Sequence, residues 1–192
     1  MTKILLVSAL LSASMLVASE KSTIVFTSFE AGFGSSKQTL SNAFNKASSS
    51  DSLSSYKLMV GSDVNLYGSG QTSRFYGSYK YSDYSRDGID SANTFAAGYR
   101  ENMKYLSLFE SEDQSMFPFA GIELGYINAS EADGFSSEID LGLAYAFSDF
   151  ELSLAYTYTY VNWGEPQAQT AYYDHNNQAT IGITYKFISE GK

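Results

Sequence analysis

Three features of this 192-residue sequence predict an all-β fold, an eight-stranded antiparallel up-and-down barrel that crosses a membrane. Apolar and polar residues alternate with a period of two in eight segments, which is the pattern of strands with one apolar face. Tyrosine and phenylalanine are abundant, at 16 and 13 residues, although the mean hydropathy is only −0.19. Long and short connections alternate between the segments, as they do when a membrane barrel has loops on one side and tight turns on the other.

The composition excludes several other classes of protein. At 44% hydrophobic and 17% charged residues, the chain is too apolar for a disordered segment. It has no cysteine, which excludes a disulfide framework and a thiolate metal site. Its net charge of −9 and its 12 dispersed basic residues argue against a nucleic-acid partner. We expect no cofactor and no metal.

The first residues, 1–19, have the pattern of a cleaved secretory signal peptide. Lys3 supplies the positive charge, and an apolar run extends from residue 4 to Ala18. This run is shorter than the roughly 20 apolar residues of a helical membrane anchor. Cleavage after Ala18 and cleavage after Ser19 both fit the pattern. The predicted mature domain, residues 20–192, contains all eight strands.

The eight predicted strands follow one another along the mature chain. Their ranges are 23–34, 56–67, 73–83, 92–109, 118–127, 137–147, 150–162 and 178–187. The first alternates least regularly because Phe26 shares a parity with Glu30, and in the fourth Glu101 interrupts an apolar series. The Ser-rich segment after the first strand either holds a short helix around 39–47 or is flexible.

The polar face of the strands distinguishes a membrane barrel from a soluble one. A soluble barrel packs its apolar face inward, whereas a membrane barrel turns that face to lipid and keeps polar groups inside. Here the polar face consists of small residues together with six acids and six bases, which suits a narrow lumen whose buried charges must pair. This predicted lumen charge network comprises Glu30, Lys57, Asp63, Arg74, Lys80, Arg100, Lys104, Glu123, Glu138, Asp140, Glu151 and Lys186.

The remaining acids are expected in loops and strand ends outside the barrel wall, where they carry the net negative charge as solvated groups. They include Asp83, Asp87, Asp90, Glu112, Asp113, Glu131, Asp133, Glu165 and Asp174. Tyrosines and phenylalanines near the strand ends lie on the apolar parity, which suits the headgroup level of a membrane.

The last segment, QATIGITYKF at 178–187, alternates toward the aromatic Phe187. With the other alternating segments, it makes the mature chain resemble the small outer-membrane β-barrels of Gram-negative bacteria, the group of OmpA-type transmembrane domains and OmpX/Ail-like and Opa-like proteins. The resemblance implies a bacterial outer-membrane location, contact with outer-membrane lipid and lipopolysaccharide, and recognition of Tyr185 and Phe187 by the barrel-assembly machinery. The chain departs from the family pattern by continuing through residues 188–192.

The same resemblance implies a structural or surface-interaction role, adhesin-like, in which four external loops meet an extracellular ligand around a lumen plugged by paired charges. A small porin or channel is the first alternative. A lipid-modifying enzyme and a soluble ligand-binding barrel are the others. The only histidine, His175, lies in the last long connection without a local serine motif, so we expect no enzymatic activity.

Overall fold

The computed structural model describes residues 24–41, 46–65, 71–85, 90–130, 132–164 and 171–188. The predicted signal peptide, 1–19, lies outside these residues. The described elements are β1 (Ile24–Ser41), β2 (Lys46–Val64), β3 (Gln71–Tyr84), β4 (Ser91–Met103), the 3₁₀ helix η1 (Lys104–Leu106), β5 (Phe109–Glu110), β6 (Gln114–Ala129), β7 (Asp133–Phe147), β8 (Phe150–Asn162) and β9 (Ala171–Ile188). A search of this described part of the chain for a helix that could cross a membrane finds none.

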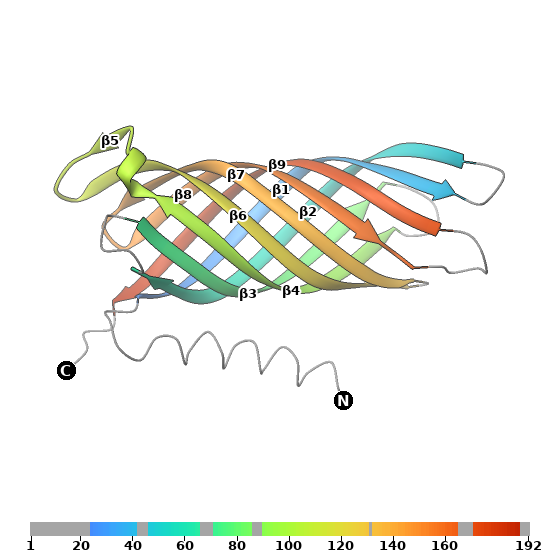
Figure 1. Cartoon of the computed structure of the whole chain (residues 1–192), viewed down its shortest axis with the longest axis horizontal. Coiled ribbons are helices and arrows are strands. Elements are labelled where there is room, and N and C mark those ends of the chain that lie inside the picture. The colour runs from blue at the N-terminus through green and yellow to red at the C-terminus, as the bar shows by residue number, and fades with distance from the viewer. Residues whose placement is uncertain are drawn as a thin grey trace, which may run out of the picture.

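Eight of the strands close into one antiparallel barrel (Figure 1). Each pairs with its neighbours along the chain, and β1 pairs with β9 over its whole length, from Ile24 opposite Ile188 to Ser41 opposite Ala171. Strand β4 pairs with β6, so the short β5 stands outside the wall and forms a hairpin with β6. The prediction of an eight-stranded up-and-down barrel is confirmed.

The two ends of the barrel differ. At one end β1 begins beside the end of β9, and we call this the terminal end. The connections β2–β3, β4–β6 and β7–β8 lie at the terminal end, and the other four lie at the opposite end, which we call the loop end. Ser148 and Asp149, the two residues between the predicted strands 137–147 and 150–162, join β7 to β8 in a tight turn, and Ser148 adopts a φ of 50° there.

The strands extend further at the loop end than the alternation predicts. Residues 39–41 and 46–47 belong to β1 and β2, so the helix suggested around 39–47 is wrong for these positions, and 42–45 lie outside the described residues. The physical reason is that neighbouring strands satisfy each other's backbone amides whatever the side chains are. The period-two pattern can be recognised only where one face of a strand is apolar. Beyond the lipid-facing part of the wall both faces of this hairpin are polar, so the pattern no longer identifies the strands.

The fourth predicted strand, 92–109, is too long. Strand β4 ends at Met103, η1 follows, and the chain then turns through β5 into β6. This connection lies at the terminal end, where only short connections were expected. The predicted contrast between long loops at one end and short turns at the other is therefore wrong, because the loop-end segments are largely paired strand.

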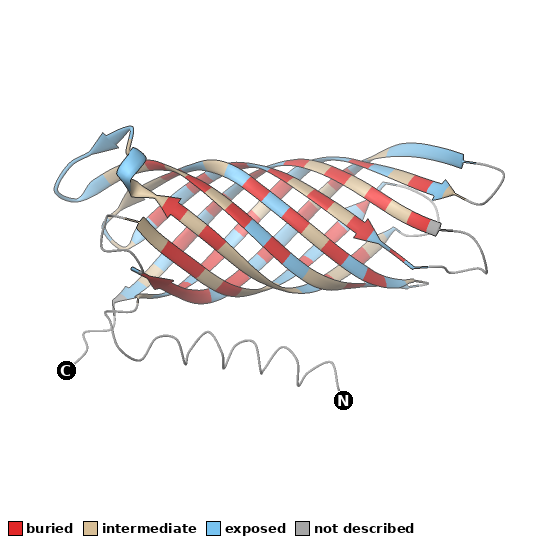
Figure 2. Cartoon of the chain, viewed as in Figure 1, coloured by how far each residue is buried: buried red, intermediate tan, exposed pale blue. Residues whose placement is uncertain are grey.

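Burial alternates along the barrel strands (Figure 2). Large apolar side chains point outward, as at Leu154 and Ile181, which are 58% and 61% exposed. Charged side chains such as Glu30 and Arg74 point inward and are buried. This is the reverse of a soluble barrel, so the outer face is built to meet lipid.

Gly98 is required by the packing of the lumen, because the buried Tyr76 ring lies against it. A Cβ added at Gly98 would lie 2.2 Å from Cζ of Tyr76. Gly98→Ala is therefore expected to displace this ring and to lower the free energy of unfolding by about 1–3 kcal/mol, measured by denaturant unfolding of the barrel in vesicles. Gly121→Ala is the matched control, since the nearest atom to its Cβ is 3.3 Å away. Equal losses in the two variants would contradict the packing argument.

Candidate functional site

The charges predicted for the lumen lie largely inside the barrel, in two clusters. Ten of the twelve residues are buried, and the Lys186 side chain is 11% exposed. The terminal cluster consists of Asp63, Arg74, Glu151 and Lys186. The central cluster consists of Glu30, Lys57, Lys80, Arg100, Glu123, Glu138 and Asp140.

Arg74 is the centre of the terminal cluster. It lies directly opposite Asp63 in the β2–β3 register, and its Nε and Nη2 donate to the two Asp63 oxygens at 2.7 and 3.0 Å. Its Nη1 and Nη2 donate to the Glu151 oxygens at 2.9 and 3.1 Å, and Lys186 Nζ lies 2.8 Å from the same carboxylate. The guanidinium also lies over the Phe26 ring, 4.4 Å from its centroid. Arg74 thus holds two carboxylates, each through two hydrogen bonds.

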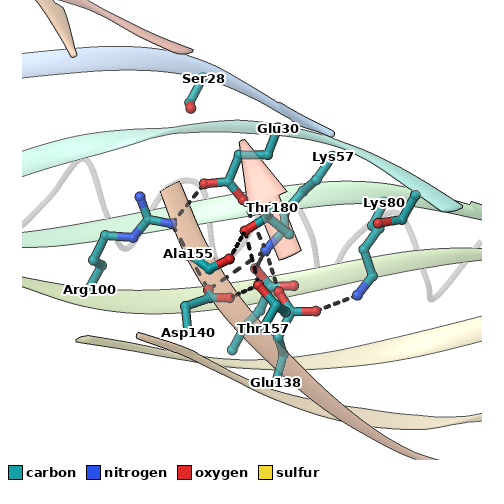
Figure 3. Close-up of polar contacts among 12 residues, drawn as sticks. Ser28, Glu30, Lys57, Lys80, Arg100, Glu138, Asp140, Ala155, Thr157 and Thr180 are labelled. Carbon is teal, nitrogen blue, oxygen red and sulfur yellow. Dashed lines mark hydrogen bonds and ion pairs between the residues drawn. The ribbon is translucent and has the colours of Figure 1, made fainter. Parts of the chain in front are cut away.

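Lys57 occupies the corresponding position in the central cluster (Figure 3). Its Nζ pairs with Glu138 and lies 3.5 Å from Glu123, 3.6 Å from Glu30 and 3.9 Å from Asp140. One ammonium therefore serves four carboxylates from β1, β6 and β7. Such sharing is possible only in a lumen so narrow that side chains from facing strands meet.

The other members of the central cluster bind further carboxylate oxygens, although Asp140 Oδ2 has ion pairs only at 3.9 and 4.0 Å and accepts no hydrogen bond from the described part of the chain. Arg100 Nη2 donates to Glu30 at 2.8 Å, and its guanidinium lies 4.2 Å from the centroid of the Phe119 ring. Lys80 pairs with Glu138. Hydroxyl groups complete the shell. Thr157 Oγ1 donates to Asp140 at 2.7 Å, as the close-up shows, and Thr159 Oγ1 donates to Glu138 at 2.8 Å.

Lys104 was predicted to join the network from a strand, but it comes from η1 and interacts with the terminal cluster only at longer range, without an ion pair to it among the described residues. It belongs to η1, after β4 has ended, and its Nζ lies 5.7 Å from the centroid of the Phe117 ring. The prediction placed Lys104 on the fourth strand, 92–109, but the observed strand β4 ends at Met103. The Lys104 ammonium contacts an aromatic face near the terminal mouth of the lumen.

An apolar layer fills the lumen at the loop end, which the sequence reasoning missed. It is formed by buried residues at the loop-end portions of the strands, namely Leu53, Tyr84, Ala92, Ile127, Ala129, Val161, Trp163 and Tyr172. Trp163 stacks on Tyr172, and its Nε1 donates to Asp174 Oδ2 at 2.8 Å. The signal was available, because the inward parity of β8 continues past its polar residues through Val161 to Trp163.

Asp174 corrects a second expectation. It was assigned to the exposed acids outside the wall, yet it is fully buried in the lumen. The reason is that β9 begins at Ala171, so residues expected in a loop alternate between the lumen and the outer surface. The net negative charge is therefore not entirely external.

Space between the charged side chains is small. A cavity of about 10 Å³ lies beside the central cluster, and its walls include Glu30, Lys57, Glu138, Ser55 and Gln178. That volume accommodates about one water molecule. Gln178 and Ser55 are hydrogen-bonded to each other across this space.

The sequence had suggested that His175 lies in a loop, but the residue lies on β9. It is partly exposed on the outer surface, with the rings of Tyr158, Tyr160 and Tyr173 around it, and its Nδ1 is 2.5 Å from the Tyr158 hydroxyl. No group of three or more potential metal-ligating His, Cys, Asp or Glu residues is found among the described residues. The arrangement around the histidine is aromatic.

The predicted assembly signal also lies on the outer surface. Tyr185 and Phe187 are 37% and 48% exposed, and their rings are 4.8 Å apart in an edge-to-face contact at the terminal end. Lys186 between them points to the terminal cluster. Recognition of this segment by the assembly machinery stays a prediction.

A closed eight-stranded barrel with an apolar outer wall and charged residues inside defines a class of architecture, the small transmembrane β-barrel. No family model matches the sequence of this chain, and no curated protein matches it.

Solved structures with a similar backbone include Neisserial surface protein A, at 13% identity over 85% of this chain and 97% of that one, with a TM-score of 0.47. The outer membrane enzyme PagL is 15% identical over 82% of this chain and 98% of that one, with a TM-score of 0.49. The outer membrane protein OprG from Pseudomonas aeruginosa is 10% identical over 88% and 97%, with a TM-score of 0.39.

Proposed function

We propose that this protein is a structural and surface-interaction component of the outer membrane, adhesin-like, with a plugged lumen and a loop end that meets extracellular ligands. The terminal end then faces the periplasm. The observation that carries the proposal is the filling of the lumen by side chains. Charged clusters occupy its middle and terminal portions, and the apolar layer around Trp163 occupies the loop end.

Paired charges support a plugged lumen because their rearrangement is costly. An ion entering the central cluster would have to displace Lys57 or Arg100 from carboxylates that are themselves buried. Leaving a buried carboxylate unpaired costs several kcal/mol, on the order of 3–5. The cavity beside Lys57 accommodates about one water molecule, whereas an aqueous channel needs a continuous water-filled passage.

The loop-end hairpins support a surface role. Strands β1 and β2 remain paired up to Ser41 opposite Lys46, and residues 46–50 are all exposed. Paired strands hold their side chains in fixed positions, so such a hairpin presents an ordered polar surface rather than a free tail. Binding residues are disproportionately found on connections that a rigid scaffold positions in this way.

Conductance measurements test the plugged lumen. Purified protein in planar lipid bilayers is expected to show no stable ion-selective openings. The lysine and arginine side chains of the two clusters, such as Lys57 and Arg74, are held across the lumen by buried carboxylates. Retarded mobility after boiling confirms that the same preparation is folded. Stable openings would overturn the proposal and favour the small-pore alternative.

Shortening the first hairpin tests the surface role. Ser35 lies opposite Ser52, so an Asn-Gly turn that joins these residues removes 36–51 and keeps the remaining register. On a protein-coated surface that retains cells producing the full chain, cells that produce this variant are expected to adhere less. A heat-modifiable band of equal intensity is the control for folding. Unchanged adherence would contradict a role for this hairpin.

An enzymatic alternative rests on His175. Purified protein is expected to leave lipopolysaccharide and phospholipid unchanged. Modification of either lipid that His175→Ala abolishes would overturn this expectation. Contacts with lipopolysaccharide and with the assembly machinery remain proposals that accompany the outer-membrane location.

A further inference from the structure

We propose that the connection from β4 to β6 is an interfacial anchor that inserts apolar side chains into the lipid leaflet at the terminal end. We call this segment, residues 104–114, the terminal arm. It comprises η1, β5 and the turn into β6. The proposal concerns the end of the barrel away from the loops, so it does not depend on the surface role proposed above.

The terminal arm exposes an unusual amount of apolar surface for a connection. Tyr105, Leu106, Leu108 and Phe109 are 54%, 49%, 68% and 50% exposed, and Figure 2 shows the arm as one exposed projection beyond the barrel. Clustered apolar side chains on a water-facing segment mark a surface that meets a membrane or a partner.

The arm is held in a defined conformation by its backbone. Leu108 N–H donates to Met116 C=O at 2.8 Å, and Ser111 N–H donates to Gln114 C=O at 2.8 Å. Ser148 N–H, from the neighbouring β7–β8 turn, donates to Asp113 C=O at 3.2 Å. These bonds fix the arm against the rim of the barrel, so its exposed apolar side chains are positioned before any contact is made.

The register of the sheet places Phe109 in line with the lipid-facing wall. Phe109 lies opposite Met116, and Met116 lies opposite Tyr145. Tyr145 lies opposite Leu152, and Leu152 opposite Ile183, both of which point outward. Residues directly opposite one another share a face of the sheet. The outer apolar face of the barrel therefore continues onto the arm, which favours lipid over a soluble partner as its occupant.

A chain of aromatic rings marks the headgroup level beside the arm. Tyr145, Phe147, Phe150, Tyr185 and Phe187 are linked by successive ring contacts with centroids 4.8–5.8 Å apart. Such rings gather at the boundary between acyl chains and water. The arm joins this belt through Tyr145, whose hydroxyl donates to Gln114 at 2.7 Å.

The charges at the tip of the arm specify the lipid, because the cation of the arm, Lys104, lies at its base beside the Phe117 ring. Glu110, Glu112 and Asp113 lie at its tip and are exposed. These acids would be repelled by an anionic surface, so the arm fits a leaflet of zwitterionic headgroups, with its tip in water and its aromatic side in the interface.

Tryptophan fluorescence of the full mature barrel in phosphatidylcholine–phosphatidylethanolamine nanodiscs tests the proposal. In Phe109→Trp the added indole is expected to emit at shorter wavelength, to be quenched by lipids brominated on their acyl chains and to be protected from aqueous iodide. Glu112→Trp, at the tip of the same arm, is the matched control and is expected to show the reverse. The emission of the lumenal Trp163, measured in the unmodified protein, is subtracted.

Iodide quenching of F109W equal to that of E112W, without quenching by brominated lipid, would overturn the anchor. Heat-modifiable mobility verifies that each variant is folded. Should F109W fail to fold, Tyr105→Trp is measured in the same way against E112W and decides between the same two outcomes. A conducting pore, or adherence that does not depend on the loop-end hairpin, would leave these readings unchanged, so failure of the proposed function remains distinguishable.

Discussion

Arg74→Met is expected to lower the free energy of unfolding by about 3–5 kcal/mol, because it leaves Asp63 and Glu151 buried without the cation that both require. Lys186 remains beside Glu151, but no other ion pair to Asp63 is found among the described residues. The loss is measured from denaturant unfolding of the barrel in lipid vesicles, followed by the retarded mobility of the unfolded form on a gel.

Two further variants show whether the buried carboxylates cause this loss. Lys37→Met removes the same charge from an exposed position on β1 and is expected to change stability by less than about 0.5 kcal/mol. The triple variant Arg74→Met, Asp63→Asn, Glu151→Gln removes the unpaired charges and is expected to recover part of the loss. A loss of unfolding free energy in the Arg74 variant no larger than that in the Lys37 variant would show that the terminal cluster does not stabilise the fold.

Leu154→Arg is expected to destabilise the protein in a bilayer by about 2–4 kcal/mol, because this side chain is 58% exposed on the outer wall within the apolar band. On a soluble barrel, a charge at so exposed a position is close to neutral. The same unfolding experiment in vesicles measures the change. The sign and size of this effect report directly on the medium that surrounds the wall.

Asn162→Arg is the matched control for Leu154→Arg. Both positions lie on the outer parity of β8, and Asn162 is its last residue at the loop end. An added arginine near the interface is expected to cost at most about 1 kcal/mol. Equal tolerance of arginine at both positions would contradict the lipid-facing assignment.

The sequence predicted the middle of each barrel strand because lipid and lumen impose opposite chemistry on its two faces. Along β8, for example, the predicted strand and the observed strand both run from Phe150 to Asn162, because that contrast holds over this whole range. At the loop end of β1 and β2 both faces carry polar residues, so strand and loop look alike in sequence. The early end of β4 was hidden because apolar residues continue into η1 and β5, which are not part of the barrel wall.

Strand parity predicted which charges face the lumen, but not which of them meet. Lys57 pairs with Glu123 and Glu138, which are 66 and 81 residues away, and these partners are set by the stagger of the closed barrel. A single sequence contains no direct record of that stagger. The Trp163–Asp174 contact was missed for a simpler reason, because both predicted strands stopped short of these residues.

The seam between β1 and β9 determines the order in which the protein is able to fold. It joins the first and last strands of the chain, and its buried Thr184–Ser28 hydrogen bond links residues 156 positions apart. Contacts between such distant segments are slow to form, because the long intervening chain must first be brought to closure. Until β9 docks, both edges of the sheet expose unpaired backbone groups that the bilayer does not tolerate. Folding and completion of the chain are therefore coupled, and a protein cut before its last strand has no stable partial barrel to adopt.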